Sequence, residues 1–116
     1  MKKRYVMFLS DILECMNRID TYTKGVDYDS FSNNQMLIDA VIRNLEVIGE
    51  AARNIPEEIR NKYSDVPWRK MIGLRNILIH EYFGIDETIV WEIIKTNLPE
   101  TKPYIMKAIQ EEGDFS

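Results

Sequence analysis

Apolar residues recur at intervals of three and four along most of the chain, which is the spacing of amphipathic helices. The first such stretch predicts a helix from Arg4 to about Thr23, with one apolar stripe: Tyr5, Phe8, Leu9, Ile12, Met16 and Ile19. A second stripe predicts a long helix that starts among Asp29, Ser30 and Ser32 and ends near Asn54: Ile38, Val41, Leu45, Ile48 and Ala52. Alternating patterns typical of strands are almost absent.

Prolines and capping residues divide the rest of the chain. Pro56 predicts the start of a short helix from Glu57 to about Lys62. Residues 64–67 form a connector, and the next helix is expected from about Pro67 to His80 or slightly beyond, with Gly84 marking its end.

The last third of the chain predicts two more helical stretches. Asp86 can cap the first of them, and Pro99 and Pro103 place a boundary before the second. Residues 111–116 are acidic, and we expect this tail to fray. The fold class predicted from these elements is an all-α, up-and-down bundle of four to five helices, in one domain covering residues 1–116.

The amino-acid composition indicates the cellular location and argues against disulfides, metal sites and membrane segments. Cys15 is the one cysteine, so no internal disulfide can form and a reducing cytoplasm is the expected location. One cysteine and one histidine make a structural zinc site very unfavourable, and no metal or other cofactor is expected. Asp11 and Glu14 interrupt the apolar run that a signal peptide would need, and no segment has the roughly 20 apolar residues of a membrane span.

Charge is unevenly distributed along the chain. The net charge of −4 argues against a general nucleic-acid coat protein. Residues 53–80, however, carry six basic and three acidic side chains, a local net charge of +3. A ligand with phosphate groups would be drawn to this segment, although a solvated basic face gives the same count.

The helix predicted after Pro67 places polar residues in an otherwise apolar run. Arg75 and His80 are five positions apart, hence about 140° apart around an ideal helix and ~7.5 Å along it. One straight helix would therefore not bring their head groups together. Because Gly73 and Gly84 allow another chain to approach closely, we expect a homodimer in which two copies of this segment face one cleft.

The spacing Arg75–x4–His80–x–Tyr82, with Asn76 directly after the arginine, resembles the motif of HEPN-type ribonucleases, and more narrowly of the HepT family. The resemblance covers residues 36–110 and is carried by three further segments: residues 39–52 (DAVIRNLEVIGEAA), residues 66–76 (VPWRKMIGLRN) and residues 90–94 (VWEII). It implies a metal-independent endoribonuclease toxin with catalytic Arg75 and His80, supported by Asn76. It also implies an antitoxin partner, a nucleotidyltransferase of the MntA type, which adds AMP to Tyr82.

Each of these residues also has an ordinary structural explanation. A single histidine in a helical protein is commonly a surface or core residue. Arg75 could form an ion pair with Glu46 or Glu50, and Tyr82 could pack at a helix end. Two alternatives therefore stay open: a non-catalytic module that binds nucleotide or RNA for a partner nucleotidyltransferase, and a purely structural helical dimer.

Overall fold

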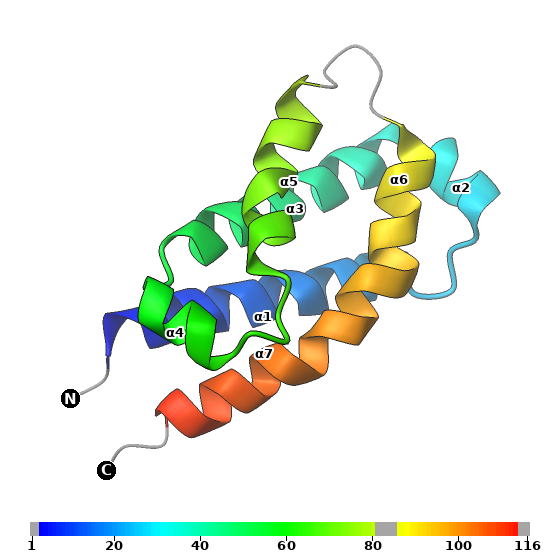
Figure 1. Cartoon of the computed structure of the whole chain (residues 1–116). Helices are drawn as coiled ribbons and strands as arrows, with labels where there is room; N and C mark the ends of the chain where they lie inside the picture. Colours follow the sequence, from blue (N-terminus) through cyan, green and yellow to red (C-terminus); the bar gives the residue numbers. More distant parts are fainter. Residues whose placement is uncertain (1–2, 81–85, 114–116) are drawn as a thin grey trace.

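Four long helical segments and two short helices make up the described part of the chain (Figure 1). The computed structural model describes residues 3–80 and 86–113, except for the side chains of residues 75–80. In chain order the elements are α1 (Arg4–Thr23), α2 (Tyr28–Ser32), α3 (Gln35–Arg53), α4 (Glu57–Lys62), α5 (Trp68–His80), α6 (Glu87–Glu92), the π-helical segment η1 (Ile93–Asn97) and α7 (Leu98–Gly113). No strand occurs among these residues, so the all-α prediction is confirmed.

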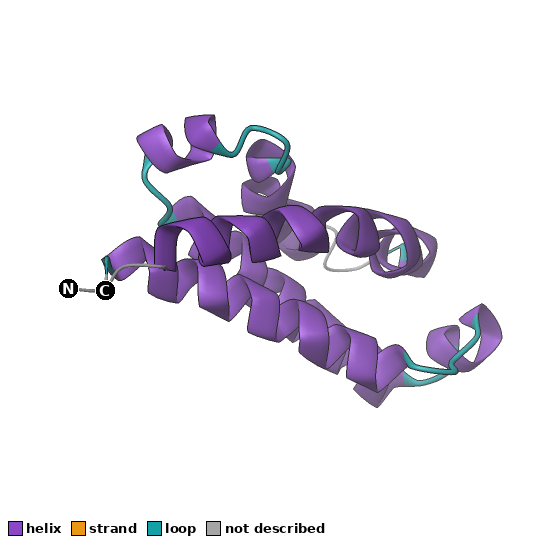
Figure 2. Ribbon diagram, turned by 90° about the horizontal axis from the view of Figure 1, so that it is seen from below, coloured by secondary structure: helices purple, strands orange, loops and turns teal. Residues whose placement is uncertain are grey.

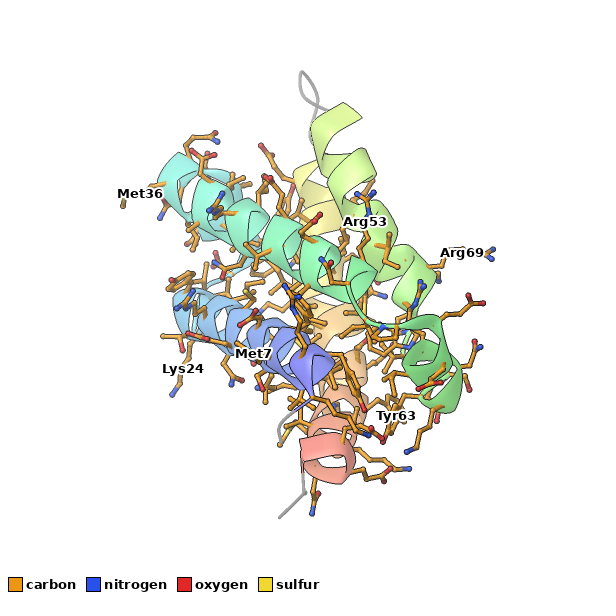
Figure 3. All side chains as sticks on the ribbon, turned by 90° about the vertical axis from the view of Figure 1, so that its left-hand side faces the viewer. Met7, Lys24, Met36, Arg53, Tyr63 and Arg69 are labelled. Atoms are coloured by element: carbon orange, nitrogen blue, oxygen red, sulfur yellow. The ribbon has the colours of Figure 1, made fainter. Side chains whose placement is uncertain are left out.

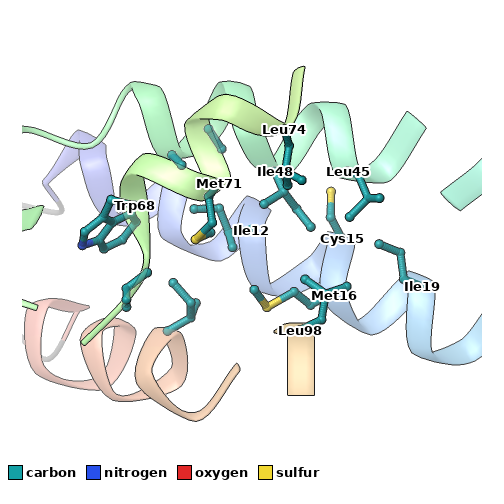
Figure 4. Close-up of a cluster of buried hydrophobic side chains, with 14 of the residues drawn as sticks. Ile12, Cys15, Met16, Ile19, Leu45, Ile48, Trp68, Met71, Leu74 and Leu98 are labelled. Atoms are coloured by element: carbon teal, nitrogen blue, oxygen red, sulfur yellow. The ribbon is translucent and has the colours of Figure 1, made fainter. Parts of the chain in front are cut away.

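Helix α3 packs against both α1 and α5, and α1 also packs against α7. The predicted stripe of α3 is buried throughout, as is most of the stripe of α1. Figure 4 shows Met71 and Leu74 of α5 beside Ile48 of α3 and Ile12 of α1, within one cluster of buried side chains. Burial of these apolar side chains stabilises the bundle and fixes which face of α5 is turned inward.

The long helix predicted from Asp29–Ser32 to Asn54 is in fact two helices. Asp27 caps α2 by accepting a hydrogen bond of 2.8 Å from the amide of Ser30, and Asn34 caps α3 by accepting one of 3.1 Å from Leu37. At the C-terminal end of α2, both the backbone amide and the side-chain amide of Asn33 donate to the backbone oxygen of Asp29, at 3.2 and 2.8 Å. Two adjacent asparagines, whose side chains compete for backbone partners, explain the break.

The boundary predicted at Pro99 and Pro103 is wrong, since α6, η1 and α7 follow one another without a break. The amide of Leu98 donates to Ile93, five residues earlier, as in a π turn. Because α7 continues directly from η1, Pro99 lies inside one helical stretch and lacks the amide hydrogen of a helical bond there. Pro103 lies inside α7 and removes one hydrogen bond, which the surrounding helix tolerates.

The C-terminal segment is also more ordered than expected. Helix α7 continues to Gly113, and Glu112 is buried with a side chain only 3% exposed. The prediction that the tail frays is therefore wrong for residues 111–113, whereas residues 114–116 lie outside the described part. The first turn of α1 and the last turn of α7 lie side by side at one end of the molecule (Figures 1 and 2).

Within the described ranges, no helix is long and apolar enough to cross a membrane.

Candidate functional site

Helix α5 carries three of the four residues singled out from the sequence. Its backbone includes Arg75, Asn76 and His80, close to the range predicted for this helix. Tyr82 lies outside the described residues, as does Gly84. The side chains of Arg75, Asn76 and His80 are likewise not described, so their roles stay predictions.

The start of α5 is held firmly by the turn that precedes it. The indole Nε1 of Trp68 donates a hydrogen bond of 3.0 Å to the backbone oxygen of Tyr63, and Trp68 itself is 7% exposed. The amide of Met71 donates to the backbone oxygen of Pro67 at 3.0 Å, closing the first helical turn. These contacts fix the direction in which α5 leaves the core.

A buried hydrogen-bond network centred on Glu112 of α7 also holds the turn before α5 in place. The carboxylate of Glu112 accepts hydrogen bonds from Lys62 at 2.6 Å, from Tyr63 at 2.7 Å and from Tyr5. The bond from Lys62, followed by those from Tyr5 and Tyr63, lowers the pKa of Glu112 from 4.5 to about 2. Burial, with the bonds to Glu112 and Glu111, raises the pKa of Tyr63 well above its ordinary value.

The two faces of α5 have different surroundings. Met71 and Leu74 are buried on the side that packs against α3, and the position of Arg75 is about 40° from that of Met71 around the helix. Gly73 lies on the other side, about 20° from the position of His80. Outside its own helix backbone and chain neighbours, no heavy atom of the described residues lies within 4 Å of a Cβ atom added at Gly73, so the described fold leaves this face open there.

The α5 backbone thus keeps Arg75 and His80 apart. It stays α-helical through His80, so the difference of about 140° between the two positions holds. Arg75 belongs to the edge that faces α3, and His80 and Asn76 belong to the open face. For Arg75 and His80 to act in one site, as the motif predicts, a second chain, the length of the arginine side chain or the backbone beyond His80 would have to bring them together.

Shallow grooves lie on α3 and at the start of α5, where Lys70 also lines a separate groove with residues of α7. One, of about 310 Å³, is lined by four residues of α3: Arg43, Glu46, Val47 and Glu50. The ion pair expected between Arg75 and Glu46 or Glu50 stays a prediction, because it involves an undescribed side chain. Another groove, of about 700 Å³, lies where α4 meets the start of α5 and contains Arg60, Arg69 and Lys70.

Sequence reasoning did not find this second groove. The excess of basic residues in residues 53–80 was visible, but it pointed only toward Arg75. Arg60 belongs to α4, and the turn through Val66 and Pro67 brings it beside the first residues of α5. That proximity is a property of the tertiary fold.

Comparison with known proteins agrees with the motif on α5. Residues 12–108 match the model of the family described as "Ribonuclease HepT-like". The chain is 53% identical over 103 residues to the Methanocaldococcus jannaschii protein named "Putative RNase MJ1380", covering 88% of this chain and 94% of that protein. It is 37% identical over 102 residues to a protein of Thermococcus cleftensis named "Probable ribonuclease HepT", covering 88% of this chain and 93% of that one.

No solved structure matches the chain significantly. The helical bundle and its motif helix are those of a HEPN-type protein. The chain belongs to the HepT-like ribonuclease family. The resemblance inferred from the sequence is therefore confirmed, and the expected enzymatic class is confirmed at the level of this family.

Proposed function

We propose that this chain is a metal-independent endoribonuclease, the toxin of a toxin–antitoxin pair. The observation that carries the proposal is the placement of the Arg75–x4–His80 motif on α5, a helix anchored at its start and open at Gly73 on the face of His80. The family membership adds independent support. Such an enzyme would act on cellular RNA, in keeping with the predicted cytoplasmic location.

The proposed reaction uses the ribose of the substrate as the nucleophile. One imidazole removes the proton from a 2′-hydroxyl, and the 2′-oxygen forms a bond to phosphorus as the bond to the 5′-oxygen breaks. A protonated imidazole gives its proton to that leaving oxygen. The products are a 2′,3′-cyclic phosphate and a free 5′-hydroxyl, with no redox change.

Arg75 and Asn76 assist this step without taking part in proton transfer. A guanidinium can hold the scissile phosphate through two hydrogen bonds and stabilise the charge that develops on its oxygens. Asn76 orients either the imidazole or the phosphate. General acid–base help of this kind contributes typically 10²- to 10⁴-fold to the rate.

A homodimer completes the proposed site. A dimer is proposed because the positions of Arg75 and His80 lie far apart around one regular helix. Two copies of α5 that face each other can pair the arginine of one with the histidine of the other. The open space at Gly73 allows such close approach. Two histidines in one cleft can also serve as base and acid.

Tyr82 is the proposed control point. It follows His80 by two positions in the sequence, and a nucleotidyltransferase antitoxin of the MntA type would transfer AMP to its hydroxyl. The added phosphate would bring negative charge and bulk next to the motif. RNA would then be excluded, because its site is filled and the charge of Arg75 is neutralised.

The experiment that tests the enzymatic proposal is cleavage of RNA by the purified, unmodified protein in EDTA. Wild type is expected to cut, and Arg75→Ala and His80→Ala are each expected to lose most of the activity with unchanged helical content. Binding of RNA without turnover by wild type would instead favour the non-catalytic module.

A further inference from the structure

The groove between α4 and α5 collects three cations around an apolar floor. We refer to it as the α4–α5 groove. Its cations are Arg60, Arg69 and Lys70, and its floor includes the buried residues Val66 and Trp68. Figure 3 shows the side chain of Arg69 pointing away from the ribbon into solvent.

The three cationic side chains have no polar partner among the described residues. The side chains of Arg60, Arg69 and Lys70 form no ion pair or hydrogen bond with the part of the chain that the structure describes. The Nε of Arg60 is buried and has no hydrogen-bond partner among the described residues. A buried guanidinium nitrogen without a partner costs free energy, and an anion in the groove that pairs with the Arg60 guanidinium would offset part of that cost.

The groove suits an anion with several oxygens. Glu57 is the one carboxylate in its lining, so the three cations leave a net charge of +2. Guanidinium groups bind phosphate oxygens in pairs of parallel hydrogen bonds, and a lysine adds a point charge. The apolar floor gives room for the sugar or base attached to a phosphodiester.

The groove also lies in line with the motif. Arg69 precedes His80 by eleven positions, which places the two about 20° apart around α5 and ~16.5 Å apart along its axis. Between them on the same face lie Gly73, which leaves the surface open, and the position of Asn76. A single strand that follows this face of α5 would therefore reach the groove.

We propose that the α4–α5 groove binds a backbone phosphate of the RNA strand at a distance from the bond that is cut. This inference rests on the proposed ribonuclease function. Arg69 and Lys70 contact the phosphate from α5, and Arg60 contacts it from α4. The groove thus extends the substrate site beyond the HepT motif itself.

The test is the salt dependence of binding to a fluorescent 2′-O-methyl RNA, which has no free 2′-hydroxyl and cannot be cut. The Arg69→Gln/Lys70→Gln variant is expected to bind roughly tenfold more weakly at low salt, with a slope of log K against log[salt] reduced by up to about 0.7, the value for one neutralised phosphate of a single strand. Both side chains are exposed, so the variant is expected to fold.

The matched control is Arg4→Gln/Lys24→Gln, which removes the same charge from exposed positions at the two ends of α1. It is expected to keep the wild-type slope. On cleavable RNA, the groove variant is expected to raise KM much more than it lowers kcat. Equal slopes of log K against log[salt] for the two double variants would overturn the inference, because the overall charge of the protein would then explain the binding.

The outcomes separate this inference from the enzymatic proposal. If wild type binds the RNA with the predicted slopes but cuts nothing, the ribonuclease proposal fails and the phosphate site stands. If wild type cuts RNA and both variants bind it equally well, the groove inference fails alone. The groove inference would also be overturned if the groove variant bound RNA as well as wild type but no longer bound a partner protein, since the groove would then be a protein-binding surface.

Discussion

Lys62 donates a hydrogen bond of 2.6 Å to the carboxylate of Glu112 and thereby joins α4 to the last turn of α7. Tyr63, the next residue, donates to the same carboxylate and accepts the indole bond of Trp68 through its backbone oxygen. The C-terminal helix therefore supports the turn from which α5 starts. This buried carboxylate links the stability of the fold to the placement of the motif.

Glu112 should make the stability of the protein depend on acid pH. Its pKa is about 2 in the folded protein and near 4.5 without these partners, so the ionised carboxylate stabilises the fold above pH 4.5. That contribution is lost as the pH falls from 4.5 toward 2. We expect the wild-type urea midpoint to drop across this range.

Glu112→Gln should be less stable than wild type at pH 7 and should lose less stability on acidification. Glu14→Gln is the matched control, because Glu14 pairs with Arg18 at 2.7 Å on an exposed surface, where such pairs contribute little. Parallel pH profiles for wild type and Glu112→Gln would contradict this role of the carboxylate.

Substitutions at Gly73 can distinguish folding of the single chain from formation of the proposed dimer. Because no described residue beyond its own helix backbone and chain neighbours lies within 4 Å of its Cβ position, Gly73→Ala and Gly73→Gln should both fold, and Ala should stabilise the helix by up to about 1 kcal/mol. The long side chain of Gln should obstruct the facing chain or the RNA. We expect the mass measured by light scattering, or the cleavage rate, to fall for Gln and to change little for Ala.

Mixed dimers test whether the site is shared between two chains. If Arg75 of one chain works with His80 of the other, an Arg75→Ala chain and a His80→Ala chain form one intact site in each heterodimer. Mixing the two inactive proteins after partial unfolding should then restore a measurable part of the activity. Mixtures as inactive as either parent would show that the two residues act within one chain or that the cleft needs both histidines.

The modification proposed at Tyr82 predicts a mass change. Protein made together with an adjacent nucleotidyltransferase should be heavier by one or more AMP groups than protein made alone, and Tyr82→Phe should show no added mass. The heavier form should cut RNA poorly. An unchanged mass shift in Tyr82→Phe would exclude Tyr82 as the one acceptor.

Local signals in the sequence predicted much of the fold. The short helix α4 was predicted from Glu57 to about Lys62, because Pro56 fixes its start. The division between α2 and α3 was missed, since Asn34 can either continue a helix or cap one. The order at the end of α7 was missed because Glu112 obtains its partners from α1 and α4.

Part of the candidate site could also be predicted from the sequence and part could not. The placement of Arg75, Asn76 and His80 on one helix, and the divergence of the arginine from the histidine, follow from local spacing. The α4–α5 groove could not be predicted in that way. Arg60 and Arg69 line one groove only because the turn anchored by Tyr63 and Trp68 brings the end of α4 near the start of α5.

The most direct test of the central claim is the RNA product formed in EDTA by wild type and by His80→Ala at equal concentration. Wild type should yield fragments that end in a 2′,3′-cyclic phosphate, and His80→Ala should yield few or none over the same time. Equal cleavage by His80→Ala, with the same product ends, would contradict the assignment of His80 as the acid–base residue and with it the proposed mechanism.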